Sequence, residues 1–469
     1  MVAVEPSRYG PGCMVANRPR RMGVRRAILL LPLGAALITG VALGPAAAAT
    51  PTPTPTATPS EPAGVDPIPS VPVTPSVSPT PTVAPSPGPQ AGSPPVAEPP
   101  VSITRPRLAP KTRLALQTRL DRLRQRYGIP GISVAIMLPD GAMWSGTSGF
   151  ADVADKTPVT RSTSFAIASV SKTFTAALIL ALAEDGRIDL DAPVRKYLPN
   201  LKKVSSKVKV RNLLDHTSGL RDFFFHPSID HLLLSKPNRR WDAAMAMKYV
   251  GKAYSEPGKS WHYSNTNYLL LGLLAETVMK EPLAEQVRTR FLEPLGLDHT
   301  WYQPEDKAPP DVAHGYRFAS ASTAAPAIDL SDGTPLVPFT SVVTAAGGAG
   351  GFASSARDLA RWAHYLYGGE VLRPEYLTAM TDAATTTALR SSIPYGYGTQ
   401  VVEIDGLRTL GHSGRLLGFR SAVRYLPDQG VSIAVVTNQS RQDPGAIVRQ
   451  LLRIALTPVD RTCVCRQRR

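Results

Sequence analysis

Cysteine is scarce in this chain of 469 residues, which contains only three. Cys13 lies near the amino terminus, whereas Cys463 and Cys465 lie one residue apart in an Arg-rich tail. A disulfide between Cys463 and Cys465 would close a very small and strained loop, and two thiols are too few for a zinc site. We therefore expect no disulfide framework. The apolar fraction of 43% indicates that most of the chain folds around a hydrophobic core.

Several sequence signatures are also absent, and their absence excludes whole classes of protein. The formal net charge is +16, which suits an anionic cell wall, lipid headgroups or nucleic acid. Because no zinc-finger, RRM or helix-turn-helix pattern accompanies this charge, we expect an anionic surface and no nucleic acid as partner. No Gly-x-Ser-x-Gly elbow of an α/β-hydrolase occurs, and no cluster of ligand-type residues indicates a metal site. We expect neither a metal ion nor a cofactor.

Residues 1–49 have the pattern of an export signal or a membrane anchor. A basic region precedes an apolar stretch, residues 27–43, and small residues follow it up to Ala49. The apolar stretch is short for a membrane span and contains Pro32, which favours cleavage over anchoring. No later stretch of the sequence is long enough to span a membrane. We predict a secreted or surface-displayed protein, and the sequence leaves the export route open.

Residues 50–105 form a predicted linker of low complexity. Residues 51–100 hold 18 of the 46 prolines, mixed with Thr, Ser, Ala and Val. Such a segment cannot bury enough apolar surface to offset its loss of conformational entropy, and proline keeps it extended. We interpret it as a disordered spacer that displays the following domain outside the cytoplasm.

Residues 106–457 carry the pattern of one α+β domain, and residues 458–469 form a basic tail. Strand signals occur at residues 132–138 and 143–150 and return between residues 397 and 438, whereas the part between them is mostly helices and loops. One amphipathic helix is predicted at each end. We expect an antiparallel sheet formed from both ends of the domain and flanked by helices, a mostly helical lobe, and an active site in the cleft between them.

Ser169 and Lys172 form the first candidate catalytic pair. They are spaced i and i+3 at the start of a mostly apolar run, residues 173–184, so on a helix they share one face. Burial lowers the pKa of a lysine, and the neutral amine can then activate a serine hydroxyl as a nucleophile. The same pattern occurs at Ser206 and Lys209, but no apolar helix follows it, so we interpret that match as accidental.

Two further elements complete the candidate site. Tyr263 and Asn265 place a phenol and a carboxamide on one side of a short turn, where a phenolate would act as general base and the amide would bind substrate. The third element, His412-Ser413-Gly414, lies on a predicted strand whose edge offers backbone N–H groups to a substrate. Gly414 is expected to let the ligand approach closely.

The order Ser-x-x-Lys, Tyr-x-Asn and His-Ser-Gly resembles the class C β-lactamase and penicillin-binding-protein-like family of serine hydrolases. The resemblance covers about residues 114–456 and includes secondary markers at residues 210–220, 346–348 and 395–398. It is closest to the secreted D-alanyl-D-alanine carboxypeptidases, which have His-Thr-Gly at the third element, whereas the β-lactamases usually have Lys-Thr-Gly. The β-lactamase and transpeptidase fold is the architecture that this resemblance implies.

The resemblance implies a catalytic role for each matching residue. Ser169 attacks the substrate carbonyl and forms an acyl-enzyme, while Lys172 and Tyr263 share the proton transfers. The backbone N–H groups of Ser169 and Arg415 form the oxyanion hole, where one donor typically lowers the barrier by about 3–4 kcal/mol. A second histidine of the chain, His216, lies in a run that we interpret as a structural turn.

The same resemblance implies the substrate-binding residues. Asn265 would bind the acyl amide, and His412 and Ser413 would face the substrate carboxylate. The similar carboxypeptidases carry an arginine just after Tyr-Gly-x-Gly, where this chain has Gln400. Carboxylate recognition is therefore expected to depend more on His412, whose charge would change near its ordinary pKa of about 6.5. Two arginines could substitute for the missing one, Arg408 and Arg415.

The function that the resemblance implies is a D-Ala-D-Ala carboxypeptidase that acts on peptidoglycan stem peptides, with β-lactams as acylating ligands. The departure at Gln400 keeps a second group of activities open, on other small acyl substrates: esterase, D-amino-acid amidase or β-lactamase. A non-catalytic wall-binding or sensor protein is the third alternative. The intact set of Ser169, Lys172 and Tyr263 disfavours it.

Overall fold

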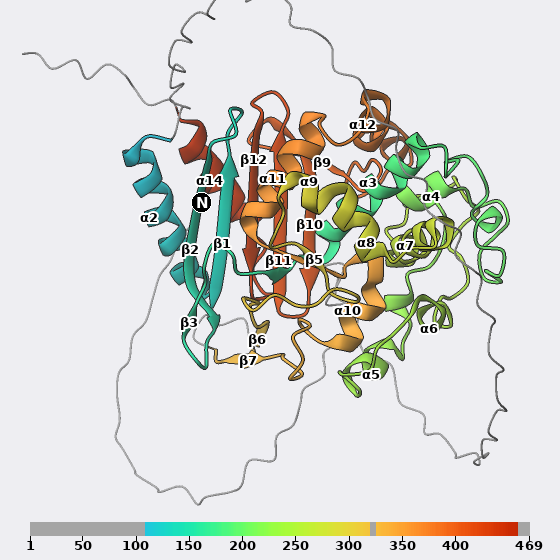
Figure 1. The fold of residues 1–469 in the computed structure, drawn as a ribbon, viewed down its shortest axis with the longest axis horizontal. Coiled ribbons are helices and arrows are strands. Elements are labelled where there is room, and N and C mark those ends of the chain that lie inside the picture. Colours follow the sequence, from blue (N-terminus) through green and yellow to red (C-terminus); the bar gives the residue numbers. More distant parts are fainter. Residues whose placement is uncertain (1–107, 319–324, 458–469) are drawn as a thin grey trace, which may run out of the picture. The chain divides into compact units, whose positions relative to one another are not determined.

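The centre of the fold is an antiparallel sheet to which both ends of the domain contribute strands (Figure 1). The structure, a computed structural model, describes residues 108–318 and 325–457. The predicted export segment, the whole of the predicted linker and the basic tail with Cys463 and Cys465 lie outside the described residues. The boundaries at residues 49, 105 and 457 therefore stay predictions.

The central sheet has seven strands. They are β1 (Gly131–Met137), β2 (Met143–Asp152), β3 (Thr157–Pro158), β9 (Gln400–Ile404), β10 (Leu407–Leu416), β11 (Phe419–Leu426) and β12 (Val431–Thr437). Their order in space is β3-β2-β1-β12-β11-β10-β9, so the first and last long strands of the domain pair with each other. The predicted α+β sheet from both ends is confirmed, and it brings the two ends of the domain together.

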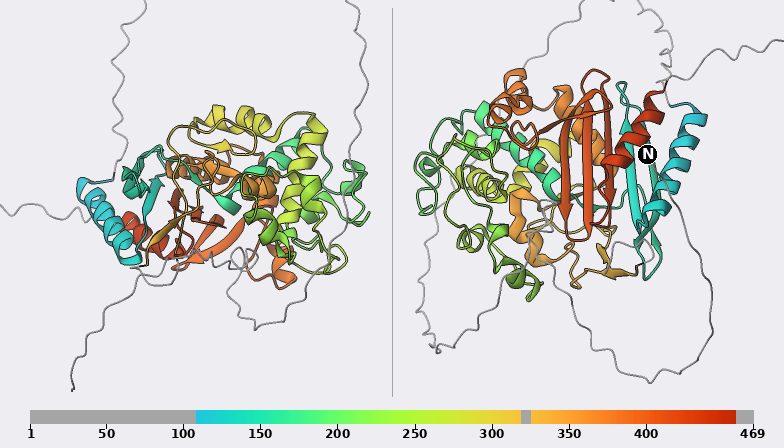
Figure 2. Two further views of the ribbon diagram at one scale, coloured as in Figure 1. Left: turned by 90° about the horizontal axis from the view of Figure 1, so that it is seen from below. Right: turned by 180° about the vertical axis from the view of Figure 1, so that it is seen from behind.

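Helices cover both faces of this sheet. On one face, α2 (Pro110–Tyr127) and α14 (Gly445–Leu456) pack side by side (Figure 2). Their buried leucines share a core with Ile132 and Val134 of β1. On the other face, α11 (Ala356–Gly368) packs against β1, β11 and β12. Because both faces are covered, β1 and β12 are buried along their whole length.

A mostly helical lobe lies beyond the β9 edge of the sheet. Its α-helices are α3 (Ser171–Glu184), α4 (Val210–Leu214), α5 (Ile229–Leu234), α6 (Ala243–Met247), α7 (Asn265–Met279), α8 (Leu283–Val287), α9 (Glu293–Leu295), α10 (Thr340–Ala346), α12 (Pro374–Thr381) and α13 (Ala384–Ala388). Short 3-10 helices are η1 (Ala168–Val170), η2 (Val194–Lys196), η3 (Phe223–Phe225) and η5 (Gly347–Ala349), and η4 (Arg288–Leu292) is a short π-helix. Small sheets add β4 (Phe165–Ala166), β5 (Trp301–Tyr302) and β8 (Phe352–Ser354), and β6 (Tyr316–Phe318) with β7 (Ala327–Asp329).

Aromatic packing fixes α3 against the sheet layer. The rings of Phe174 in α3 and Trp362 in α11 stack with centroids 4.2 Å apart and planes 8° apart. The Trp362 indole N–H donates to Thr173 Oγ1 at 2.9 Å, so the polar end of the ring is satisfied as well. Both rings are fully buried. The helix that begins just after Ser169 is thus held by the sheet's own covering helix.

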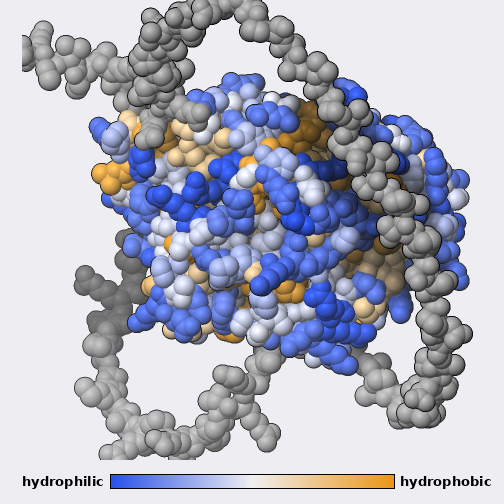
Figure 3. Space-filling view, viewed as in Figure 1, coloured by the Kyte–Doolittle hydropathy of each residue, from blue (hydrophilic) through white to orange (hydrophobic). Residues whose placement is uncertain are grey.

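The visible surface of the domain is mainly polar. On the face shown in Figure 3, hydrophilic side chains dominate and apolar side chains form separate small patches. Within residues 108–318 and 325–457, no helix combines the length and the apolar character that a membrane crossing requires.

Candidate active site

The backbone turn η1 places Ser169 at the entrance of α3, and Lys172 follows one turn later inside that helix. The Lys172 Nζ lies 3.1 Å from the Ser169 Oγ, as the i and i+3 spacing predicts. Ser169 is half-buried, whereas Lys172 has no exposed surface. The predicted pair is therefore in contact, with the hydroxyl toward the accessible side and the amine behind it.

Two carbonyl oxygens hold the amine of Lys172 from behind. Nζ donates to the side-chain Oδ1 of Asn265 at 2.8 Å and to the backbone oxygen of Ala349 at 2.6 Å. A neutral amine has two N–H groups and one lone pair, and both of these oxygens can only accept. When Lys172 is neutral, its lone pair therefore faces the Ser169 hydroxyl, which is the orientation that a general base needs.

Asp222 is a buried residue of the site that the sequence reasoning missed. Its Oδ2 accepts from the backbone N–H of Asn265 at 3.0 Å and from the side-chain Nδ2 at 2.7 Å, while Oδ1 accepts from the Phe224 N–H at 3.0 Å. The carboxylate fixes which end of the Asn265 carboxamide faces Lys172. Its only sequence signal was its place shortly after the marker at residues 210–220.

Burial sets the protonation of the two residues that flank Ser169. Desolvation lowers the pKa of Lys172 to about 7, against the opposing attraction of Asp222. Burial raises the pKa of the Tyr263 phenol above its ordinary range, while a hydrogen bond to Ser169 opposes the rise. The expected phenolate is therefore disfavoured. Lys172 can therefore lose its proton at lower pH than an ordinary lysine, while the Tyr263 phenol keeps its proton and bonds Ser169.

His216 supports Tyr263 and is more than the predicted turn residue. Its ring lies 4.3 Å from the Tyr263 ring, centroid to centroid, and the side chain is fully buried. The backbone N–H of Ser264 donates to Nδ1 at 3.2 Å, which leaves the proton of the neutral ring on Nε2. The left-handed φ of 64° at His216 turns the chain so that this contact forms.

His412 lies in the site, but its environment differs from the one expected. The ring is buried, Nε2 lies 3.0 Å from the Tyr395 hydroxyl, and Nδ1 lies 2.7 Å from the Ser413 carbonyl oxygen. Burial and the charge of Lys172 hold the pKa of His412 well below its ordinary value. Burial and the contacts at both nitrogens therefore disfavour the charge change expected of His412 in the working pH range, which stays a prediction.

The side-chain oxygen of Gln400 is also engaged by the protein. Its Oε1 accepts from the Ser413 N–H at 3.1 Å, the Ser413 hydroxyl at 3.2 Å and the buried Arg424 guanidinium at 2.9 Å. The Ser413 hydroxyl therefore donates to Gln400 in this structure. Arg424 is a buried cation that the sequence reasoning did not identify. Its guanidinium donates to the backbone oxygen of Val423 and to Gln400 Oε1.

The edge of β10 next to the site is open. Pairing of β9 with β10 stops at Gly411 opposite Gln400, although β10 continues for five residues. The Ser413 N–H points to the β9 side, as its bond to Gln400 shows. Because the N–H direction alternates along a strand, the N–H of Arg415 points to the same open edge. This orientation fits the oxyanion donor that the resemblance implied.

Gly414 allows a close approach of backbone rather than of ligand. A Cβ at this position would lie 2.2 Å from the Ile167 carbonyl oxygen, 2.2 Å from Ser421 Oγ and 3.1 Å from the Ala168 Cβ. The absent side chain lets β10 pack directly against the turn that carries Ser169. This packing gives Gly414 a role in placing Ser169, while its role in ligand approach stays a prediction.

The accidental Ser-x-x-Lys match is separated from this site. Ser206 is exposed in a turn, and Lys209 pairs at 3.0 Å with the carboxylate of Asp191. No helix buries either side chain, in line with the sequence interpretation.

A group of three residues in the described chain has the geometry of possible metal ligands. Asp152, His314 and Asp329 present ligand atoms within 4.8 Å of one another. The His314 ring already bonds Asp329 at 2.7 Å, and the carboxylates raise the pKa of the ring. These residues share no member with the site around Ser169.

The family model for beta-lactamase matches residues 116–456. The chain belongs to the beta-lactamase family. The match contains every residue of the site described above, from Ser169 to Arg415, so the family's fold and this site coincide in one domain.

Similar proteins of known structure have the same fold. The D-amino acid amidase from Ochrobactrum anthropi SV3, complexed with D-phenylalanine, is 27% identical, with a TM-score of 0.63 over 74% of this chain and 99% of that chain. A D-stereospecific amidohydrolase from Streptomyces sp. is 28% identical, with a TM-score of 0.59 over 70% and 94%. Among curated relatives, Protein flp of Staphylococcus aureus (strain MW2) is 26% identical over 70% of this chain. The chain spans 63% of the length of that relative.

The first prediction concerns the base. The kcat/KM for an uncharged substrate should rise with pH and level off above a midpoint near pH 7, because Lys172 acts only when neutral. In Asp222→Asn the midpoint should move to lower pH, since the charge that favours protonated Lys172 is gone. Asp358→Asn, which changes another buried carboxylate, is the control and should leave the midpoint in place. An unmoved midpoint in Asp222→Asn would show that this carboxylate does not act on the base.

The second prediction concerns the nucleophile turn. Gly414→Ala should slow acylation of Ser169 by about 10²-fold, because the new methyl group displaces the turn at Ile167 and misplaces the hydroxyl. Gly368→Ala is the matched control, since its Cβ would meet only the Tyr425 hydroxyl at 3.8 Å. The measurement is the rate of labelling by a fluorophosphonate. Equal rates in the two variants would contradict the close packing of β10 on this turn.

Proposed function

We propose that this chain is a serine hydrolase that forms an acyl-enzyme on Ser169 and cleaves amides or esters whose leaving group carries no carboxylate. D-Amino-acid amides are the proposed substrate class. The proposal rests on the contacts of the His-Ser-Gly element. Burial holds the pKa of His412 well below its ordinary value, and both of its ring nitrogens are bonded within the protein. The Ser413 hydroxyl donates to Gln400.

The proposed reaction starts with neutral Lys172, which accepts the proton of the Ser169 hydroxyl as its oxygen attacks the substrate carbonyl. The backbone N–H groups of Ser169 and Arg415 stabilise the negative oxygen of the tetrahedral intermediate. As the intermediate collapses, Lys172 returns the proton to the leaving amine or alcohol through the Tyr263 hydroxyl. Water then attacks the acyl-enzyme by the same proton path, and the acid is released. The net reaction consumes one water and needs no cofactor.

Electrostatics support a leaving group without a carboxylate. A substrate carboxylate buried in the site needs a cation or several N–H donors to offset its desolvation. Gln400 stands where the similar carboxypeptidases have an arginine, and its oxygen faces donors of the protein itself. An amide or ester leaving group makes no such demand. The likeness to two D-stereospecific amide hydrolases of known structure is a second support.

A D-Ala-D-Ala carboxypeptidase that cleaves peptidoglycan stem peptides, and that β-lactams acylate, is the second candidate function. One observation favours it. Arg415 follows the His-Ser-Gly element, is only half-buried, and its Nε has no hydrogen-bond partner among the described residues. Its guanidinium would be the carboxylate partner in that reaction. Asn265 would bind the acyl amide in either reaction, although one of its N–H groups already serves Asp222.

We also propose that the domain acts outside the cytoplasm. The basic and apolar leader of residues 1–49 and the proline-rich residues 50–105 support this proposal, together with the net charge of +16, which suits an anionic wall or membrane surface.

The third prediction separates the two candidate functions with a matched pair of substrates. A peptide that ends in D-Ala-D-Ala with a free carboxylate is compared with the same peptide blocked as its C-terminal amide. D-phenylalaninamide and a short-chain ester are measured in parallel. We expect the blocked peptide to be cleaved at least as fast as the free one, because Gln400 stands where an arginine would bind the carboxylate and its side-chain oxygen is already bonded within the protein. A preference of about tenfold or more for the free peptide, lost in Arg415→Gln, would instead support the carboxypeptidase.

The nucleophile is tested in the same series. Ser169→Ala should abolish turnover of every substrate, whereas Ser206→Ala should leave all rates unchanged. Turnover that survives in Ser169→Ala would overturn the acyl-enzyme assignment.

A further inference from the structure

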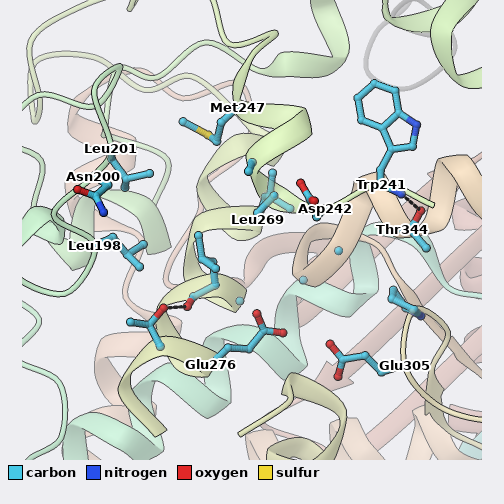
Figure 4. A pocket seen from close by; sticks show the side chains of 18 of the residues that line it. Leu198, Asn200, Leu201, Trp241, Asp242, Met247, Leu269, Glu276, Glu305 and Thr344 are labelled. Atoms are coloured by element: carbon cyan, nitrogen blue, oxygen red, sulfur yellow. Dashed lines mark hydrogen bonds between the residues drawn. The ribbon is translucent and has the colours of Figure 1, made fainter. Parts of the chain in front are cut away.

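A cavity of about 810 Å³ lies in the helical lobe, away from the catalytic serine. Its walls are formed by the residues that follow η2, by α6 and the residues before it, by α7 and by η5 (Figure 4). Its volume falls in the range of sites that enclose small organic ligands.

The cavity and the active site lie back to back. Gly347 and Gly348 of η5 line the cavity, and the next residue, Ala349, bonds Lys172 on the other side. A Cβ on Gly348 would lie 2.8 Å from the backbone oxygen of Tyr268, so η5 and α7 touch directly and close the wall. Neither Ser169 nor Tyr263 lines the cavity. It is therefore a separate compartment and no part of the substrate site.

One part of the cavity is apolar. Leu198, Leu201, Met247 and Leu269 present aliphatic side chains to it, as Figure 4 shows. Ala244 of α6 is exposed and also lines it. This wall can take the hydrocarbon part of a ligand out of water.

The opposite part of the cavity is acidic. Glu276 of α7 and Glu305, which follows β5, point toward each other (Figure 4). Burial and the neighbouring carboxylate of Glu305 raise the pKa of Glu276 to about 7. Glu305 accepts from the Ala284 N–H at 2.9 Å, which holds it in place at the start of α8. No ion pair of either carboxylate with a cation occurs in the described part of the chain.

The charges around this carboxylate pair are mostly negative. Arg240, a cation that lines the cavity, donates to the backbone oxygen of Pro304. The charged side chains that line the cavity or the adjoining hollow are Arg240 and Asp242 before and at the start of α6, Lys280 and Glu281 after α7, Glu285 in α8, and Asp306 after β5.

We propose that this cavity binds a ligand with a protonated amine on an apolar body. The ammonium group lies between the carboxylates of Glu276 and Glu305, and the body lies against Leu198, Leu201, Met247 and Leu269. An ammonium group between Glu276 and Glu305 takes the place of the proton that otherwise reduces the repulsion between the two carboxylates. A neutral or anionic ligand does not reduce this repulsion. Both halves of the cavity then have a partner of matching chemistry.

The proposal has a definite pH dependence. Glu276 is protonated below about pH 7, and the ammonium must displace that proton. An alkyl amine stays charged up to about pH 10. Affinity should therefore rise with pH, by roughly tenfold between pH 5.5 and 8.5, and binding near pH 7 should release a proton. The other charged groups near the pair are the carboxylates of Asp242 and Asp306, Arg288 beside Asp306, and the cations Arg240 and Lys280.

Isothermal titration calorimetry of the full chain tests the proposal with 4-phenylbutylamine as the probe. The neutral analogue 4-phenylbutanol and the anion 4-phenylbutyrate have the same body and serve as matched ligands. We expect the amine to bind at least about tenfold more tightly than the alcohol and the anion not to bind. Equal affinities of amine and alcohol, or an affinity that does not change with pH, would overturn the assignment.

Four variants test where the amine binds. Glu276→Gln should weaken amine binding by about fivefold or more and remove its pH dependence, while its amide can still bond Glu305 and keep the fold. Glu281→Gln, outside the cavity wall, is the control and should bind as the parent chain does. Ala244→Trp should fill the cavity and abolish binding with both glutamates intact. Unchanged binding in Ala244→Trp would place the amine elsewhere and sink the proposal. Ser169→Ala should bind normally, so the result stands apart from the catalytic assignment.

Discussion

The rest of this structure depends on one constraint: the primary amine of Lys172 is buried away from water. The Nζ of Lys172 is fully enclosed, and the protein offers it two carbonyl oxygens and one hydroxyl. Burial makes the charged form costly, and Asp222 at the far side of Asn265 reduces that cost without removing it. The balance leaves the amine able to lose its proton near neutral pH, and its two N–H groups direct the lone pair to Ser169.

The three partners of this amine come from three distant parts of the chain, so the fold must bring them together closely. Ser169 comes from the turn before α3, Asn265 from the first residue of α7, and Ala349 from η5. Glycines permit the contacts: a Cβ on Gly348 would meet the backbone of α7, and a Cβ on Gly414 would meet the nucleophile turn. The same wall of α7 and η5 separates the catalytic amine from the acid-lined cavity behind it. Both compartments therefore share the same two backbone segments.

The sequence predicted those features that depend on local spacing. The i and i+3 distance put Ser169 beside Lys172, and alternating apolar residues indicated the strands that became β1, β2, β11 and β12. The start of β9 was placed three residues too early, at residue 397, because Tyr397 and Gly398 form a turn before the strand begins.

Features that arise from burial and distant contacts could not be read from spacing. Asp222 and Ala349 have no motif of their own, and only the fold brings them to Asn265 and Lys172. His412 looked like a titrating residue, since nothing in its strand pattern showed that Tyr395 and the Ser413 carbonyl enclose it. Burial likewise raises the pKa of Tyr263, which favours the phenol over the expected phenolate. Local pattern therefore indicated the candidate residues, and the packing around them sets the direction of their pKa shifts.

A direct titration of the Lys172 amine tests the central claim. Lysine labelled with ¹³C at Cε gives one NMR signal per side chain, and the Lys172 signal is assigned by its loss in Lys172→Arg. The account predicts a midpoint near pH 7 for this signal, while exposed lysines titrate near pH ~10.4. A Lys172 midpoint together with the exposed lysines would contradict the account, because the amine would then be charged at neutral pH and unable to act as the base.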